Sequence, residues 1–145
     1  MNPPERNPTP SPAESWLWQT AALLQRYRLP LLVLATLLVF GLSSIPFRTP
    51  MRAWRLDKLM HVLEYLLVGL AYLNFITQGY RRLNWSKAAV YLLLLATLAA
   101  LDEFYQRLVP GRSPDWRDWL ASIGGGLVAL ALTAWISRKV AAQQA

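Results

Sequence analysis

Cysteine is absent from the 145-residue chain, and charged residues make up only 16% of it. Without cysteine there is no disulfide framework, no thiolate metal site and no cysteine nucleophile. A soluble domain carries about 25% charged residues, and a small one needs polar residues to cover its surface. The shortage of charge therefore argues against a soluble domain, and the 54% of apolar residues argues against a disordered chain. The length indicates one domain.

Acidic residues are scarcer than basic ones. The chain has 15 Lys and Arg against 8 Asp and Glu, for a net charge of +7. In a soluble protein this balance would point to nucleic acid. Here the basic residues lie in short clusters between long apolar runs, a pattern typical of membrane anchoring. We therefore expect membrane lipids as partners and no nucleic acid, while the oligomeric state stays open.

Four apolar segments approach the length needed to cross a membrane, which takes about 20 mainly apolar residues. They cover residues 29–47, 59–78, 85–105 and 119–137. All seven tryptophans fall at or just outside the ends of these segments, as expected of the aromatic belt of a membrane protein. The sequence thus predicts an all-α, polytopic bundle of four transmembrane helices.

The remaining segments differ in composition. Residues 1–15 contain five prolines and are predicted to be a disordered tail. Residues 16–28 are either a short helix at the membrane surface or an extension of the first span. Residues 138–145 form a basic C-terminal tail.

Four spans place both termini at one end of the bundle. The other end, called the motif end below, holds the loops 48–58 and 106–118. Basic residues are divided eight to seven between the terminal end and the motif end, so the positive-inside rule is nearly balanced. We expect cytoplasmic termini, because the basic residues at the terminal end have no evident task other than anchoring.

The second span begins with ionisable residues. Asp57, His61 and Glu64 or Tyr65 are spaced i, i+4 and i+7 or i+8, so they share one helix face. Ionisable groups at this depth normally face a bundle interior or a wet cavity. One imidazole with carboxylate oxygens suits Mn²⁺, Mg²⁺ or Ca²⁺. The spacing is not an established metal motif, however, and we predict neither a metal nor a cofactor.

Further polar residues gather where the third span ends. Asp102 or Glu103 can share a face with Gln106, and six of the eight acidic residues lie at the motif end. Ser113 is the expected cap of the fourth helix.

The fourth helix has acidic residues at its start and small residues along one stretch. Pro114 is expected at the first helical position, and Asp115 and Asp118 in the first turns, where the helix dipole favours negative charge. The small residues allow close helix packing; they are Ala121, Ser122, Gly125, Gly126 and Ala129.

Two motifs resemble those of VanZ-like membrane proteins. DKLMHVLEYLLVG at 57–69 resembles the Asp-Lys-x-x-His-x-x-x-Tyr motif of this family. DEFYQRLVPGRSPDWRDWLASIGG at 102–125 resembles the second motif, Asp-Glu-x-x-Gln followed by Pro-Gly-Arg-Ser and then an Asp. The resemblance covers about residues 30–135, with one departure at Ser122, where Asn or Asp is expected. The matching positions are Asp57, Lys58, His61, Tyr65, Glu103, Gln106, Arg112, Asp118 and Gly125.

The resemblance implies a bacterial cytoplasmic-membrane protein of several helices, and its name-giving member is linked to resistance to the glycopeptide teicoplanin. The first hypothesis for the polar residues is an enzyme acting on an envelope lipid or a lipid-linked cell-wall intermediate. In it Asp57 orients His61 as general acid or base, and Glu103 or Asp118 assists. The residues expected to bind an anionic head group or other parts of the ligand are Lys58, Glu64, Tyr65, Gln106, Arg112 and Asp118.

Two other hypotheses stay open. The same groups could bind or shield a ligand without chemistry. Alternatively, buried ion pairs such as Lys58 with Glu103 only determine how the helices pack.

Overall fold

A computed structural model describes residues 19–20, 22–45, 54–80 and 83–142. This part of the chain is helical and contains no strand, which confirms the predicted all-α class. The predicted tail at 1–15 lies outside the described residues, as do 16–18 of the next predicted segment and the last three residues of the chain.

Three of the helices are long and apolar enough to cross a membrane. They are α3 (Trp54–Thr77), α4 (Trp85–Gln106) and α5 (Trp116–Ala142). Each coincides with a predicted span, although α5 continues five residues into the segment predicted as the C-terminal tail. These three helices make the protein a multi-pass membrane protein by length and composition.

The first predicted span corresponds to a shorter helix, α2 (Arg28–Ser43), of 16 residues. Residues 22–26 are helical as well, and a turn at Tyr27 separates them from α2. Pro30 explains the interruption, because proline has no N–H to donate to the carbonyl four residues earlier. The side-chain amide of Asn74 in α3 donates to the carbonyl of Leu24 at 2.9 Å, so the preceding turn also packs on the bundle.

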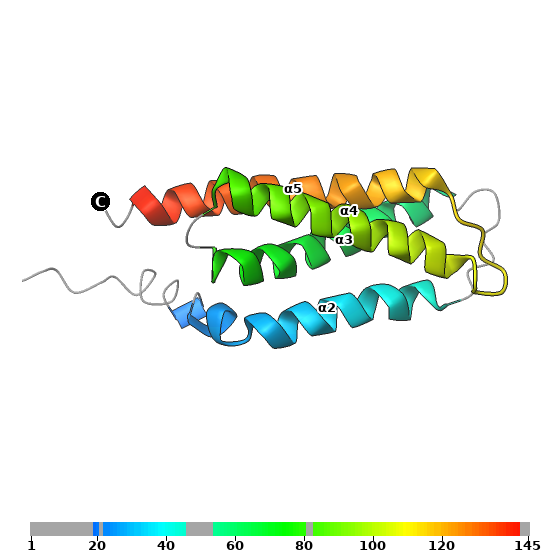
Figure 1. The fold of residues 1–145 in the computed structure, drawn as a ribbon, viewed down its shortest axis with the longest axis horizontal. Coiled ribbons are helices and arrows are strands. Elements are labelled where there is room, and N and C mark those ends of the chain that lie inside the picture. The colour runs from blue at the N-terminus through cyan, green and yellow to red at the C-terminus, as the bar shows by residue number, and fades with distance from the viewer. Residues whose placement is uncertain (1–18, 21, 46–53, 81–82, 143–145) are drawn as a thin grey trace, which may run out of the picture.

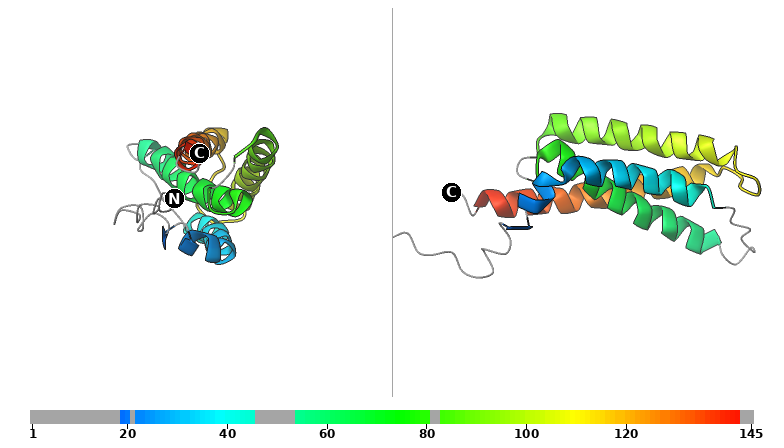
Figure 2. Two further views of the ribbon diagram at one scale, coloured as in Figure 1. Left: turned by 90° about the vertical axis from the view of Figure 1, so that its left-hand side faces the viewer. Right: turned by 90° about the horizontal axis from the view of Figure 1, so that it is seen from below.

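The helices form an elongated bundle in which consecutive helices run in opposite directions (Figure 1). Viewed along its length, α3 lies in the middle and contacts all three other helices (Figure 2). Helices α3 and α5 run in the same direction and form the most extensive contact. The end of α2, the start of α3, the end of α4 and the start of α5 therefore meet at the motif end.

Small residues allow α3 and α5 to approach closely. A Cβ atom added at Gly125 would collide with the backbone carbonyl of Val62 and lie 3.0 Å from the backbone nitrogen of Leu66. Ser122 and Ala129 are buried on the same helix. The predicted small-residue contact is thus confirmed, and it places the first turn of α5 directly beside the first turns of α3.

The side chains that face outward along the bundle are mostly apolar. Leu34 in α2 is 64% exposed and Leu93 in α4 is 69% exposed, as expected when the surroundings are lipid rather than water. The polar side chains are instead buried between helices, and most of them lie at the motif end.

Candidate functional site

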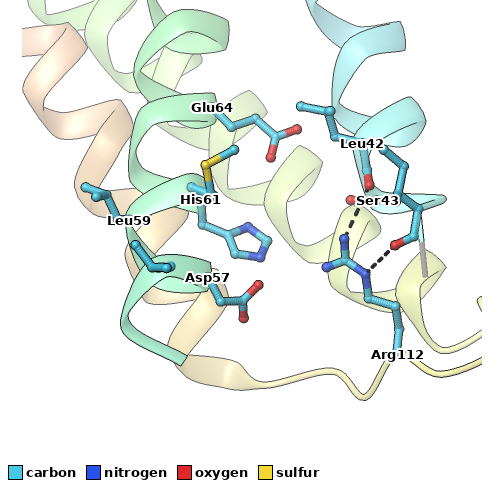
Figure 3. A pocket seen from close by; sticks show the side chains of 10 residues that line it. Leu42, Ser43, Asp57, Leu59, His61, Glu64 and Arg112 are labelled. Atoms are coloured by element: carbon cyan, nitrogen blue, oxygen red, sulfur yellow. Dashed lines mark hydrogen bonds between the residues drawn. The ribbon is translucent and has the colours of Figure 1, made fainter. Parts of the chain in front are cut away.

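A cavity of about 300 Å³ opens between α2 and α3 at the motif end. Its walls combine apolar side chains with four ionisable ones (Figure 3). The lining residues are Leu42, Ser43, Ile45, Leu56, Asp57, Leu59, Met60, His61, Glu64 and Arg112. The predicted shared face of Asp57, His61 and Glu64 is confirmed, because all three line this cavity.

Asp57 and His61 in α3 meet Asp118 in the first turn of α5. One potential ligand atom from each of the three side chains lies within 4.8 Å of the others. We call these three residues the carboxylate–histidine cluster. Its members make no hydrogen bond or ion pair to one another, although His61 and Asp118 are both only 4% exposed.

The partner of His61 is Ser122, one turn further along α5. The Ser122 hydroxyl and His61 Nδ1 are 3.4 Å apart. The carboxylate of Asp57 lies within 4.8 Å of the imidazole without a hydrogen bond to it, so its orienting role stays a prediction. The sequence marked Ser122 as a small packing residue and as a departure from the motif, but not as a partner of His61. It does not line the cavity, so its hydroxyl faces His61 rather than a ligand.

Lys58 bridges two acidic residues of the neighbouring helix start. Its ammonium group forms ion pairs with Asp118 and, at 2.9 Å, with Asp115. The structural hypothesis named Glu103 as the partner of Lys58. The structure instead pairs Lys58 with Asp115 and Asp118. Lys58 is not among the cavity-lining residues, so its charge serves the α3–α5 contact.

The start of α5 is capped by Asp115 rather than by Ser113. The helix begins at Trp116, and Asp115 Oδ1 accepts a hydrogen bond from the backbone N–H of Arg117 at 2.9 Å. That bond, with the Lys58 ammonium, holds the pKa of Asp115 below its ordinary value. Glu103 in α4 accepts a hydrogen bond from the backbone N–H of Asp115 at 3.2 Å, which connects the two helices.

A second buried network joins α2 to α4. The Ser43 hydroxyl donates to Asp102 at 2.5 Å, and the Gln106 amide donates to Ser43 at 3.3 Å and to Asp102 at 3.5 Å. All three side chains are buried. We call them the Ser43–Asp102–Gln106 network. Ser43 and Asp102 were not among the predicted site residues. The one sequence signal for this network was the spacing of Asp102 four residues before Gln106, which places both on one helix face.

Arg112 connects this network to the end of α2. Its guanidinium donates to Gln106 at 3.4 Å and to the backbone carbonyls of Leu42 and Ile45 at 3.3 and 3.2 Å. Leu42 lies in the last turn of α2 and Ile45 just beyond its end, where backbone carbonyls lack the N–H groups of a further helical turn. Arg112 thus lines the cavity and at the same time caps α2 (Figure 3).

Of the other predicted binding residues, some line the cavity and others are buried away from it. Tyr65 is completely buried in the core and is not among the cavity-lining residues. Glu64 faces the cavity, and its Oε1 atom is buried without a hydrogen-bond partner. Glu103 also has one buried carboxylate oxygen with no such partner. An unpaired buried carboxylate oxygen is costly, so these two atoms favour a ligand or ion that completes their contacts.

The family follows from comparison of the chain with known families. The VanZ/LLP1 family model matches residues 9–137. The chain belongs to the VanZ/LLP1 family. Comparison with curated proteins and with solved structures found no match.

The VanZ-like motifs thus converge at one end of the bundle. Asp57 and His61 of the first motif line the cavity together with Arg112 of the second, and the same two residues form the cluster with Asp118 of the second motif. The arrangement can bind a polar group between acidic and imidazole side chains. Its imidazole and carboxyl groups are of the kinds that transfer protons in enzymes.

Proposed function

We propose that this VanZ-like protein binds the head group of an envelope lipid, either a lipid-linked cell-wall intermediate or a phospholipid, in the cavity between α2 and α3. This binding, in the same proposal, lowers the susceptibility of the cell to teicoplanin-type glycopeptides. The observation that carries it is the cavity itself, which places ionisable groups beside apolar side chains on the outer surface of a membrane helix.

An amphipathic ligand suits both kinds of wall. Leu56, Leu59 and Met60 line the cavity and are at least half exposed, so they favour contact with acyl or prenyl chains. Deeper in the cavity, Glu64 and His61 favour hydroxyl, amide or amine groups. Arg112 and Lys58 are already engaged with protein acceptors, so a head group rich in hydroxyl or amine groups suits the cavity better than a purely anionic one.

Native mass spectrometry of the purified protein tests this binding. The two probes are phosphatidylglycerol and a polyprenyl-diphosphate-linked saccharide, each titrated in detergent. We expect Glu64→Gln to weaken binding of the preferred probe about tenfold, because a buried polar group left without its hydrogen-bond partner costs about 1–3 kcal/mol. Arg117→Gln removes a charge from an exposed side chain outside the cavity and should leave binding unchanged.

The resistance part of the proposal has its own measurement. Expression in a susceptible bacterial host should raise the minimal inhibitory concentration of teicoplanin, and Glu64→Gln should reduce this increase at equal protein abundance. Equal susceptibility of cells with and without the protein would contradict this part. Binding of neither probe, or equal binding by the Glu64 variant, would contradict the ligand site.

A structural function is the second candidate, and the Ser43–Asp102–Gln106 network favours it. The network is buried and internally hydrogen-bonded without any ligand. If polar residues only hold α2 and α4 together, Asp102→Asn should lower protein abundance while the protein that remains keeps full activity.

A further inference from the structure

We infer that the carboxylate–histidine cluster is a binding site for one divalent transition-metal ion of the Mn²⁺ or Zn²⁺ class. Asp57, His61 and Asp118 are the protein ligands. The site lies between α3 and α5. Asp57 and His61 also line the cavity of the proposed function, but the inference does not require a lipid to be bound there.

The ligand atoms of the three side chains are already almost as close together as they would be around a bound ion. Ligand atoms about 2.0–2.2 Å from one ion lie about 3–4 Å from each other. The three ligand atoms lie within 4.8 Å of one another, so contraction by about 1 Å brings them into contact with a single ion. No bond among the three side chains has to be broken for this movement.

The histidine has the environment of a metal ligand rather than of a core residue. His61 is only 4% exposed. In the described structure its one hydrogen-bond partner is the Ser122 hydroxyl, which lies beside Nδ1. A metal-binding imidazole usually has its second nitrogen held by such a partner, which orients the ring. Nε2 is therefore the nitrogen left for an ion, and the ring is turned toward the side where Asp57 lies (Figure 3).

The local charge also favours a cation. The cluster brings two carboxylates together, those of Asp57 and Asp118. In the described structure Lys58 forms an ion pair with Asp118 but not with Asp57. A divalent ion between the two carboxylates offsets their negative charge, and burial makes that attraction stronger than in water.

The composition of the site selects the class of ion. Ca²⁺ prefers six to eight oxygen ligands, whereas one imidazole and two carboxylates suit Mn²⁺ and Zn²⁺. Lys58 binds Oδ1 of Asp118 and leaves the second oxygen of that carboxylate for the ion. Lys58 is then a positioning residue that orients a ligand.

The test uses the full chain in detergent with an affinity tag that contains no histidine. After treatment with EDTA, Mn²⁺ is titrated and followed by electron paramagnetic resonance, and Zn²⁺ is added as competitor. We expect about one Mn²⁺ per chain, displaced by Zn²⁺. Because His61 is the single histidine of the chain, imidazole-nitrogen modulation in the spin-echo signal identifies it as a ligand without any mutation.

Variants locate the ion. His61→Ala and Asp118→Asn should weaken Mn²⁺ binding by at least about 100-fold, more than the loss of an orienting partner costs. Arg107→Gln removes a charge from an exposed side chain at the motif end that belongs neither to the cavity nor to the cluster, and it should change the affinity less than about threefold. It is the control.

Two outcomes overturn the inference: no stoichiometric Mn²⁺ or Zn²⁺ binding, or binding without nitrogen modulation. If a variant does not fold, the nitrogen modulation measured on the unaltered protein is sufficient to show whether His61 binds the ion. The readout contains no lipid, so its failure is distinct from failure of the proposed function.

Discussion

At the residue scale, two adjacent glycines of α5 face different surroundings. A Cβ atom at Gly125 would meet the backbone of α3, while a Cβ atom at Gly124 would meet nothing within 4 Å. Of these two glycines, only Gly125 is needed for the close approach of α5 to α3 beside His61. A glycine in a membrane helix is therefore informative only once its neighbours are known.

Gly125→Ala is expected to destabilise the protein, and Gly124→Ala is not. Overpacking against a backbone that cannot move aside costs about 1–3 kcal/mol, whereas alanine at an open helical position gains about 0.5–1 kcal/mol over glycine. Thermal unfolding in detergent, followed by size-exclusion chromatography of heated samples, measures both. Equal midpoints for the two variants would contradict the packing described here.

At the element scale, α2 is the helix most dependent on polar contacts. It has no contact with α5, and its last turn is held by Arg112 and the Ser43–Asp102–Gln106 network. Further along the bundle, the hydroxyls of Thr36 and Tyr72 are 3.0 Å apart. Because the lipid-facing side of a helix gains little from apolar contact in a membrane, these hydrogen bonds contribute much of its docking.

Arg112→Lys should loosen the end of α2. Lysine is a point charge on a flexible stem and cannot reproduce the forked donor arrangement of arginine. Each lost hydrogen bond contributes about 1 kcal/mol, so amide hydrogen exchange at residues 42–45 should become about fivefold faster or more. Arg107→Lys, at an exposed position, is the control. Unchanged exchange in Arg112→Lys would show that the guanidinium does not hold α2.

At the scale of the whole molecule, the number of membrane crossings depends on α2. Its 16 residues rise about 24 Å, short of a hydrocarbon core of about 30 Å. Taken with the helical residues 22–26, the segment 22–43 rises about 33 Å. We therefore expect α2 to cross the membrane together with the preceding turn, which makes four crossings with both termini on one side.

Single cysteines test this topology, because the chain contains none of its own. With four crossings, cysteines at Ser11 and Ser86 lie on one side of the membrane and one at Ser113 on the other. We expect an impermeant thiol reagent to label only position 113 in intact cells, and all three after permeabilisation. Labelling of 11 together with 113 would show that α2 does not cross. Labelling of 11 and 86 alone would place the motif end in the cytoplasm.

Much of the fold could be predicted because membrane helices are encoded locally. Long apolar runs of the right length, with tryptophans at their ends, identify spans without any knowledge of neighbours. The weakest prediction concerned the first span, where Pro30 interrupts the helix and shortens it. Helix ends were also less certain, since the cap of α5 is Asp115 rather than Ser113.

The sequence by itself determined that the chain is an all-α membrane protein and that its ionisable residues gather at one end, because both follow from local composition and helical spacing. Tertiary structure alone decided which of these residues touch. Ser122 lies at hydrogen-bond distance from His61, Lys58 pairs with Asp115 and Asp118 rather than Glu103, and Ser43 donates to Asp102. These partners lie 57–61 residues apart in the chain, and the close approach of α3 and α5 at Gly125, with the capping of α2, brings them together.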